Sequence, residues 1–135
     1  MTSQKRRIVA YLAGRIISGK NPSGIFDRAS SSWTSVSVVT APNHLSVYDH
    51  DRACMISVVG PPKDLYVYDA GSGRHIQLKI NGCNFSGYDF ETQAFFSGNV
   101  TGTSVFFCDF QHSDFFKYST QPAPRPSPPR VATPK

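Results

Sequence analysis

Hydrophobic and polar residues alternate in short runs along most of the chain, and the runs recur with a period of 20 residues. Runs such as 65–69 (Leu-Tyr-Val-Tyr-Asp) and 76–80 (Ile-Gln-Leu-Lys-Ile) space apolar residues two apart, as a half-buried β-strand requires. Copies of the first run all end in aspartate: Asp49, Asp69, Asp89 and Asp109 at intervals of 20 residues, and Asp27 22 residues before Asp49. Self-similarity at a fixed period indicates one small unit stacked on itself, and here that unit is a β-hairpin.

Each unit holds two strands, joined after the aspartate by about four polar or small residues and at the other end by a tight turn. Asn81–Gly82 is the strongest turn signal, because a type I′ turn needs positive φ at both of its central residues. Thr101–Gly102 stands at the same place one repeat later. This turn sets Ile80 opposite Cys83, on a face where large residues meet glycine, and we expect that face to form the core.

The N-terminal run 10–16 aligns with the repeat copy 94–100 and is therefore predicted as a strand, although Ile8, Val9, Leu12 and Ile16 also have near-helical spacing. The count is then about 11 short antiparallel strands in a meander from residue 10 to residue 119. A long open meander would leave exposed edges, so it closes into a barrel, rolls up, or folds over as a sandwich. The predicted class is all-β, and the pattern leaves these three architectures open.

The segment 121–135 has a different composition. Six of its fifteen residues are proline and none is aromatic, so we expect a disordered tail with polyproline character. The predicted organisation is a basic N-terminal segment 1–7, a single hairpin-repeat domain 8–120 and the Pro-rich tail 121–135.

Charge divides along the same boundaries. The chain is +5 overall, but residues 1–20 hold five Lys and Arg and the tail holds three. The remaining six Lys and Arg face all nine Asp and Glu, so the hairpin array is acidic, at −3. Basic character is therefore confined to the ends, and Lys5, Arg6 and Arg7 form a candidate contact for an acidic surface or polymer.

Two features bear on the compartment. The apolar run 8–14 follows basic residues as a signal peptide does, but Arg15 interrupts it, and no run approaches the ~20 apolar residues that span a bilayer. Cys54, Cys83 and Cys108 occupy three different repeat positions, which gives no disulfide ladder. We expect a cytoplasmic protein with reduced thiols and no membrane contact.

The aspartates admit two interpretations. A row of carboxylates binds cations, whereas a single Asp at the start of a turn accepts a hydrogen bond from the backbone two residues on. Equivalent positions in successive hairpins lie about 9–10 Å apart, and carboxylate–calcium distances are about 2.4 Å. Neighbouring aspartates of a flat meander are too far apart to share an ion, so we interpret all five as turn caps.

Large side chains also recur on the face opposite the core. Aromatic residues precede most of the aspartates, and a second set follows six residues after them. Such a stripe is either covered by a second layer or used for contact. The candidate contact residues are Trp33, Tyr48, Tyr68, His75, Tyr88 and Phe95.

Signals of catalysis are weak. The four histidines fall at different phases of the repeat and show no metal-binding spacing, and no phosphate-binding or dinucleotide-binding motif is present. Cys54 follows His50 and Asp51 closely, which suggests an activated thiol only if the fold brings them together. We expect no cofactor, no metal and no enzymatic activity.

The run 66–74 (Tyr-Val-Tyr-Asp-Ala-Gly-Ser-Gly-Arg) resembles the bacterial YD repeat, which typically reads Tyr-x-Tyr-Asp-x-x-Gly-Arg and builds β-hairpins. The Gly-Arg is displaced by one residue, and the other copies keep only the residue before the aspartate and the aspartate itself. The hairpin period is also similar to that of cell-wall choline-binding repeats, whose Gly-Trp and Trp-Tyr-Tyr signatures are missing. The resemblance implies a bacterial origin and a binding or scaffolding role.

The sequence thus predicts a non-catalytic binding or assembly module that uses an aromatic face, with a protein partner or a second copy as its contact. Glycan binding through the aromatic column is the first alternative. Binding of nucleic acid or another acidic partner through the basic termini is the second. The identity of the ligand and the oligomeric state are not determined by this pattern.

Overall fold

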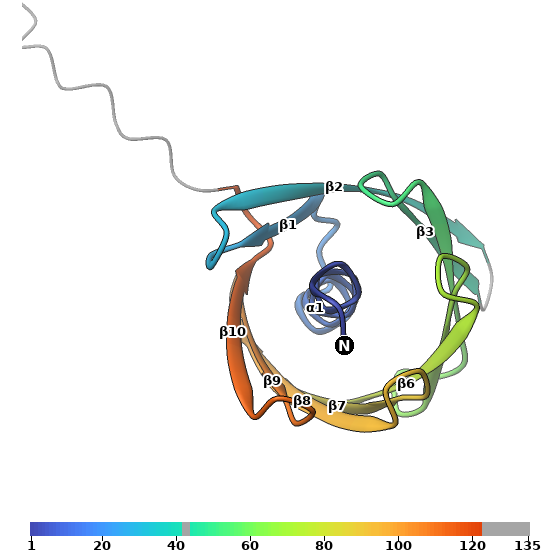
Figure 1. The fold of residues 1–135 in the computed structure, drawn as a ribbon. Helices are drawn as coiled ribbons and strands as arrows, with labels where there is room; N and C mark the ends of the chain where they lie inside the picture. Colours follow the sequence, from blue (N-terminus) through green and yellow to red (C-terminus); the bar gives the residue numbers. More distant parts are fainter. Residues whose placement is uncertain (42–43, 123–135) are drawn as a thin grey trace, which may run out of the picture.

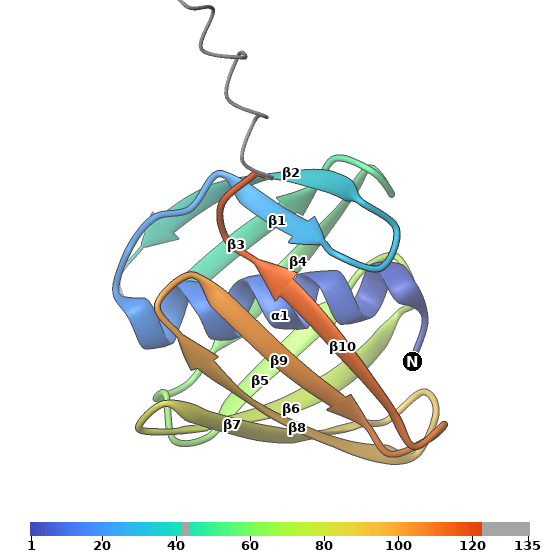
Figure 2. The ribbon, with the colours of Figure 1, turned by 90° about the vertical axis from the view of Figure 1, so that its left-hand side faces the viewer.

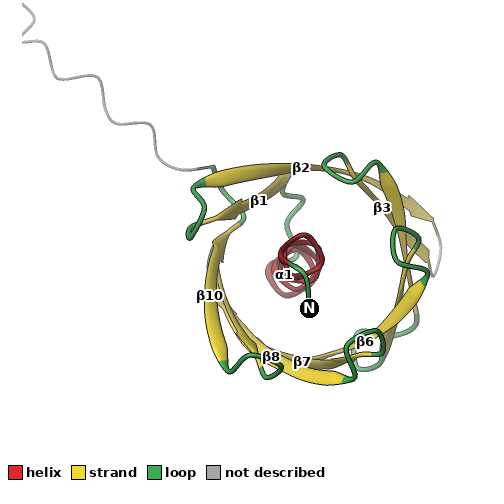
Figure 3. Ribbon diagram, in the orientation of Figure 1, coloured by secondary structure: helices red, strands yellow, loops and turns green. Residues whose placement is uncertain are grey.

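The structure is a computed structural model that describes residues 1–41 and 44–122. Ten antiparallel strands close into a barrel, and one helix lies inside it (Figure 1, Figure 3). The elements are α1 (Ser3–Ser18), β1 (Gly24–Asp27), β2 (Ser32–Ala41), β3 (His44–Asp49), β4 (Cys54–Val59), β5 (Leu65–Asp69), β6 (Arg74–Asn81), β7 (Asn84–Asp89), β8 (Ala94–Thr101), β9 (Ser104–Asp109) and β10 (Asp114–Ser119). Each strand pairs with its neighbours in the chain, and β1 pairs with β10 to close the sheet. The all-β hairpin meander is confirmed, and it takes the form of a closed barrel.

Residues 10–16 are helical, so the prediction of a strand there was wrong. The helix begins after Thr2, whose side chain accepts a hydrogen bond from the Lys5 backbone at 3.2 Å. It ends at Gly19, which has a φ of 70° and donates to the Arg15 carbonyl. These two caps are ordinary helix boundary signals, and they define the helix better than the apolar spacing does.

The burial of the helix explains why its near-helical spacing was weaker evidence than the alignment of residues 10–16 with the repeat copy 94–100. Figure 2 shows α1 running through the barrel, and all five residues from Val9 to Ala13 are 0% exposed. A helix enclosed on every side lacks the polar face that reveals a period of 3.6 residues. A barrel of ten strands encloses more space than inward side chains of the strands fill by themselves, and α1 occupies that space.

The register differs from the predicted one by two residues. Ile80 lies opposite Phe85 rather than Cys83, because Gly82 and Cys83 form the two-residue loop. Gly82 has a φ of 62°, while Cys83 is not among the residues with positive φ, which is the pattern of a type II′ turn. A shift of two residues leaves every side chain on the same face, so the predicted core face is correct.

Glycine makes room for rings within the barrel. Gly98 lies opposite Phe85 in β7, and Gly87 lies opposite Phe96 in β8. A Cβ atom on Gly98 would come within 2.3 Å of the Phe85 ring, and one on Gly87 within 2.4 Å of the Phe96 ring. The phenylalanine rings therefore occupy the volume that a side chain at either glycine would need.

The predicted boundary between residues 7 and 8 falls inside α1, so residues 3–7 belong to the helix and not to a separate segment, and Lys5 and Arg6 are buried in the barrel. The predicted disordered tail lies outside the described residues from position 123 onward. Within the described ranges, no helix combines the length and the apolar character needed to cross a membrane.

Candidate functional site

Five equivalent turns form one end of the barrel, here called the aspartate end. Each turn begins at one of the five aspartates, whose Oδ1 accepts a hydrogen bond of 3.0–3.1 Å from the backbone N–H two residues on. The loop closes five residues after each aspartate, as in the pair Asp49–Cys54. The last loop residue has a φ between 51° and 69° in all five turns. The repeat in the sequence is thus a repeat in geometry.

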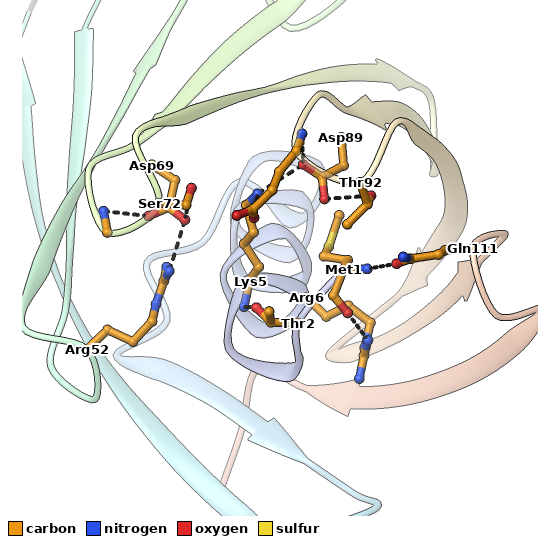
Figure 4. A network of polar contacts seen from close by, with 12 residues as sticks. Met1, Thr2, Lys5, Arg6, Arg52, Asp69, Ser72, Asp89, Thr92 and Gln111 are labelled. Atoms are coloured by element: carbon orange, nitrogen blue, oxygen red, sulfur yellow. Dashed lines mark hydrogen bonds and ion pairs between the residues drawn. The ribbon is translucent and has the colours of Figure 1, made fainter.

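The same carboxylates are buried, and each also contacts a cationic group, through Oδ1 in Asp89 and through Oδ2 in the other four. Cationic groups of the chain contact all five aspartates around the N-terminal end of α1. Figure 4 shows Asp69 and Asp89 beside that end of the helix. Lys5, Arg6 and Arg7 are consecutive, and successive helical residues point about 100° apart. Each of the three side chains therefore reaches a different part of the ring that the five aspartates form, here called the aspartate ring.

Lys5 contacts the turn between β7 and β8. Its Nζ lies 2.9 Å from Asp89 Oδ1 and 2.8 Å from Glu91 Oε1, and the Lys5 side chain is 2% exposed. Asp89 also accepts from the backbone of Glu91 and from the hydroxyl of Thr92. The ammonium and the carboxylate are thus both hydrogen-bonded, as buried charges must be.

Arg6 contacts β9, β10 and the start of the chain. Its Nη1 lies 3.4 Å from Asp109 Oδ2, its Nε donates to the Tyr118 hydroxyl at 3.3 Å, and its guanidinium lies 3.7 Å from the centre of the Phe116 ring. The Met1 ammonium lies 3.5 Å from Asp109 and donates to the Gln111 side chain. Burial raises the pKa of Tyr118 to about 12, and the hydrogen bond from Arg6 opposes that rise.

Arg7 contacts the part of the aspartate ring next to β1, β2 and β3. Its Nε donates to Asp27 at 3.2 Å, and its Nη2 donates to the Ser30 hydroxyl at 3.1 Å. Its Nη1 lies 3.7 Å from Asp51, which also accepts from the Thr34 hydroxyl.

The remaining two aspartates share one arginine of the barrel itself. Arg52 donates to Asp49 at 2.8 Å and to Asp69 at 2.9 Å (the latter contact is drawn in Figure 4). Burial lowers the pKa of Arg52, but the hydrogen bonds to both aspartates outweigh it, and the net pKa is raised. The guanidinium of Arg52 thus bridges two neighbouring aspartates.

These contacts give the aspartate end a structural role. The acidic hairpins and the basic helix neutralise each other, and the carboxylates lie near the positive end of the helix dipole. The prediction that Lys5, Arg6 and Arg7 form an external basic patch was wrong, because Lys5 is 1% exposed and all three are paired inside the barrel. Across the described residues, no group of three or more His, Cys, Asp or Glu is placed to hold a metal ion.

The outer surface carries the second feature, here called the aromatic wall. It comprises the outward-facing rings of β5 to β10 and of their loops near the aspartate end: Tyr66, Tyr68, His75, Tyr88, Phe90, Phe95, Phe106, Phe110 and Phe115. Four phenylalanines of the wall, Phe90, Phe95, Phe110 and Phe115, have 45–65% of their surface exposed, and Tyr66 has 45%.

Adjacent rings of the aromatic wall touch across the strands. Tyr88 lies 4.8 Å from Phe95 and 4.9 Å from Phe90 between ring centres, and both contacts are edge-on. Tyr68 and His75 lie 5.0 Å apart. The backbones of Phe90 and Phe110 donate to those of His75 and Phe95, so each loop phenylalanine continues the row beyond the strand pair. Phe106 and Phe115 stack at 5.4 Å. The ring contacts therefore form three groups on neighbouring strands, Tyr68 with His75, Tyr88 with Phe90 and Phe95, and Phe106 with Phe115, here together called the aromatic ladder.

The predicted contact residues divide into two groups. Tyr68, His75, Tyr88 and Phe95 come together in the aromatic wall. Tyr48 of β3 contacts His50 in the following turn. Trp33 of β2 pairs with Phe26 of β1, and its ring lies against Gly24. Among the described residues, neither ring contacts the aromatic ladder.

The loop residues Phe90 and Phe110 belong to the aromatic wall although they were not among the predicted contact residues, and their position directly after an aspartate was a usable signal. The pairing of Lys5, Arg6, Arg7 and Arg52 with the aspartates was not predicted, and the opposite charges of the N-terminus and the hairpins were the signal for the first three.

Two cavities and one cysteine thiol are further features that could bind or react. Tyr66, Gly73, Arg74, His75 and Phe90 line an open depression of about 490 Å³ on the aromatic wall. A second cavity of about 470 Å³ lies at the other end of the barrel, between the end of α1 and the loops near Cys83 and Thr103. Burial raises the pKa of the Cys54 thiol, which disfavours its reactive thiolate, although the nearby Arg52 opposes the rise.

Comparison of this chain with protein-family models, with curated proteins and with solved structures finds no match in any of the three.

Proposed function

We propose that this protein acts by binding rather than by catalysis, and that the aromatic wall is the surface through which it binds or assembles with protein. The observation that carries the proposal is the exposure of four phenylalanines on one side of the barrel. An aromatic side chain has a surface of about 200 Å², so these four rings expose on the order of 400–500 Å². An apolar patch of that size on a monomer is often an interaction site.

The chemistry of the wall favours protein over sugar. Its most exposed members are phenylalanines, which carry no hydroxyl group to hydrogen-bond a sugar. The rings of Tyr88, Phe90 and Phe95 meet edge-on and so present no single flat platform. The wall of a closed barrel is also convex (Figure 1), whereas small ligands favour concave sites.

The other functions are supported less well. Nucleic-acid binding through the N-terminal basic residues would require Lys5, Arg6 and Arg7 to leave their carboxylate partners in the barrel. A thiol enzyme would need a reactive Cys54, and burial raises the pKa of that thiol. All three cysteines are free, which supports the proposed cytoplasmic location.

Site-specific photo-crosslinking in the cells that make the protein tests the proposal. A benzophenone amino acid replaces Phe95, which is 64% exposed on β8, and in a matched control it replaces Val39, which is 65% exposed on β2. We expect protein adducts from position 95 and few from position 39. Equal adducts from the two positions, or none from position 95, would contradict the proposal. Glycan adducts at position 95 would contradict a protein partner and support the glycan-binding alternative.

A further inference from the structure

The proposed function does not say which protein is the partner, and the shape of the aromatic wall limits the choice. Resting on that proposed function, we infer that the partner is a second copy of this chain, packed wall to wall about a two-fold axis. Three observations carry the inference: the wall contains both a projection and a matching depression, its charged neighbours are complementary, and its area suits a dimer.

The projection is Phe110, and the depression lies between Tyr66 and Phe90. Phe110 stands in the loop between β9 and β10 with 53% of its surface exposed. The depression has a volume of about 490 Å³, which is large enough for an aromatic side chain, and His75 also lines it. In a two-fold dimer each copy inserts its own Phe110 into the depression of the other, and every contact occurs twice.

The ladder places the two-fold axis between these features. Tyr88 and Phe95 lie between the depression on β5 to β7 and the projection after β9. Phe110 is joined to Phe95 through the backbone hydrogen bond that continues the strand pair. An axis through Phe95 therefore brings Phe95 against its own counterpart at the centre of the interface, where a large aromatic side chain contributes most to binding.

Charge agrees with this arrangement. Arg74 lines the depression, and Asp114 begins β10 directly after the loop that holds Phe110. Both side chains are exposed, and within the described residues of one copy neither forms an ion pair. When Phe110 of one copy enters the depression of the other, Asp114 approaches the partner's Arg74. Opposite charges at the rim of an interface fix its register.

The area is sufficient for such a dimer. The exposed rings of the wall, with Tyr66 and Tyr68 added to the four phenylalanines, amount to roughly 600 Å² per copy, and a standard interface buries about 800 Å² per partner including its polar rim. Polar residues at the edge of the wall, such as Arg74 and Asp114, supply the rest of the interface area.

Sedimentation velocity of the purified full chain over a wide range of concentration tests the inference. We expect a reversible species of twice 14.9 kDa. Phe110→Ser and Phe95→Ser should each raise the dissociation constant at least roughly tenfold, and Val39→Ser, an equally exposed control, should leave it unchanged. Circular dichroism checks that each variant keeps the barrel.

A charge exchange adds a readout that loss of folding cannot imitate. Arg74→Asp should weaken the dimer by repulsion, and the double variant Arg74→Asp with Asp114→Arg should restore it. A wild-type chain that stays monomeric at all concentrations, or a dimer that survives both phenylalanine substitutions, would overturn the inference. The proposed function would still stand if crosslinking at position 95 traps a different protein, and it fails separately if position 95 traps none.

Discussion

Lys5→Met is the most informative single change in the interior, because it removes one charge of a buried pair and little volume. Asp89 is 1% exposed and would lose its only cationic partner among the described residues. Breaking a buried ion pair from one side costs about 3–5 kcal/mol. Asp89 keeps its bonds from the Glu91 backbone and the Thr92 hydroxyl. We therefore expect the lower end, about 3 kcal/mol, out of a total stability of about 5–15 kcal/mol.

The assay is urea unfolding followed by the fluorescence of Trp33, the single tryptophan of the chain. The same loss should lower the melting temperature by about 12 °C for a domain of this size. Lys79→Met is the matched control, because Lys79 is exposed on β6, and it should change the free energy of unfolding by less than about 0.5 kcal/mol.

A double variant separates the charge from the packing of the lysine side chain. Asn at position 89 can still accept from the Glu91 backbone but carries no charge, so Lys5→Met with Asp89→Asn should recover about 1 kcal/mol or more relative to Lys5→Met alone. A Lys5→Met protein within about 1 kcal/mol of the wild type would refute the reasoning that Lys5 neutralises a buried carboxylate.

Three further predictions concern packing, pH and the thiols. Gly98→Ala should lower the free energy of unfolding by about 1–3 kcal/mol, because its Cβ would lie 2.3 Å from the Phe85 ring and 2.1 Å from the Phe106 carbonyl oxygen. Denaturant unfolding measures this loss, and a loss near zero would contradict the close packing at Gly98. Because folding raises the pKa of Tyr118 from 10.0 to about 12, its contribution to stability is complete below pH 10 and is lost as the pH rises through about 12. Melting temperatures across this window should fall less steeply for Tyr118→Phe than for the wild type, and parallel curves would count against the shift. After brief alkylation at neutral pH, mass spectrometry should find Cys83 modified well before Cys54, because Cys83 is exposed and the pKa of Cys54 is raised. The reverse order would support the alternative of an enzyme that uses the Cys54 thiol.

The repeat could be predicted because it is local. Alternation of apolar residues and a fixed spacing of aspartates depend on neighbours in one hairpin, so the strands, the core face and the position of each loop followed from the sequence. The exact pairing did not, since whether Asn81–Gly82 or Gly82–Cys83 forms a two-residue turn depends on small differences in turn energy.

The helix and its ion pairs could not be predicted by the same reasoning. Residues 10–16 resemble a repeat copy in composition, and only closure of the barrel creates an interior that a helix fills. Lys5 and Asp89 are 84 residues apart in the chain, and nothing local to either predicts their contact. The aromatic wall lies between these cases: Tyr88 and Phe95 were predicted from strand alternation, whereas Phe90 and Phe110 depend on how the loops continue the ladder.

Hydroxyl-radical footprinting tests the central claim most directly, because it measures the accessibility of each aromatic ring in one experiment. Phe95 and Phe96 are neighbours in the chain, yet one is 64% exposed on the aromatic wall and the other 1% exposed in the core. With the protein diluted until it is monomeric, we predict fast modification of Phe95, Phe110 and Phe115, and slow modification of Phe96 and of Tyr11 in the enclosed helix. Similar rates for Phe95 and Phe96, or rapid modification of Tyr11, would contradict a barrel that holds its helix inside and its aromatic wall outside.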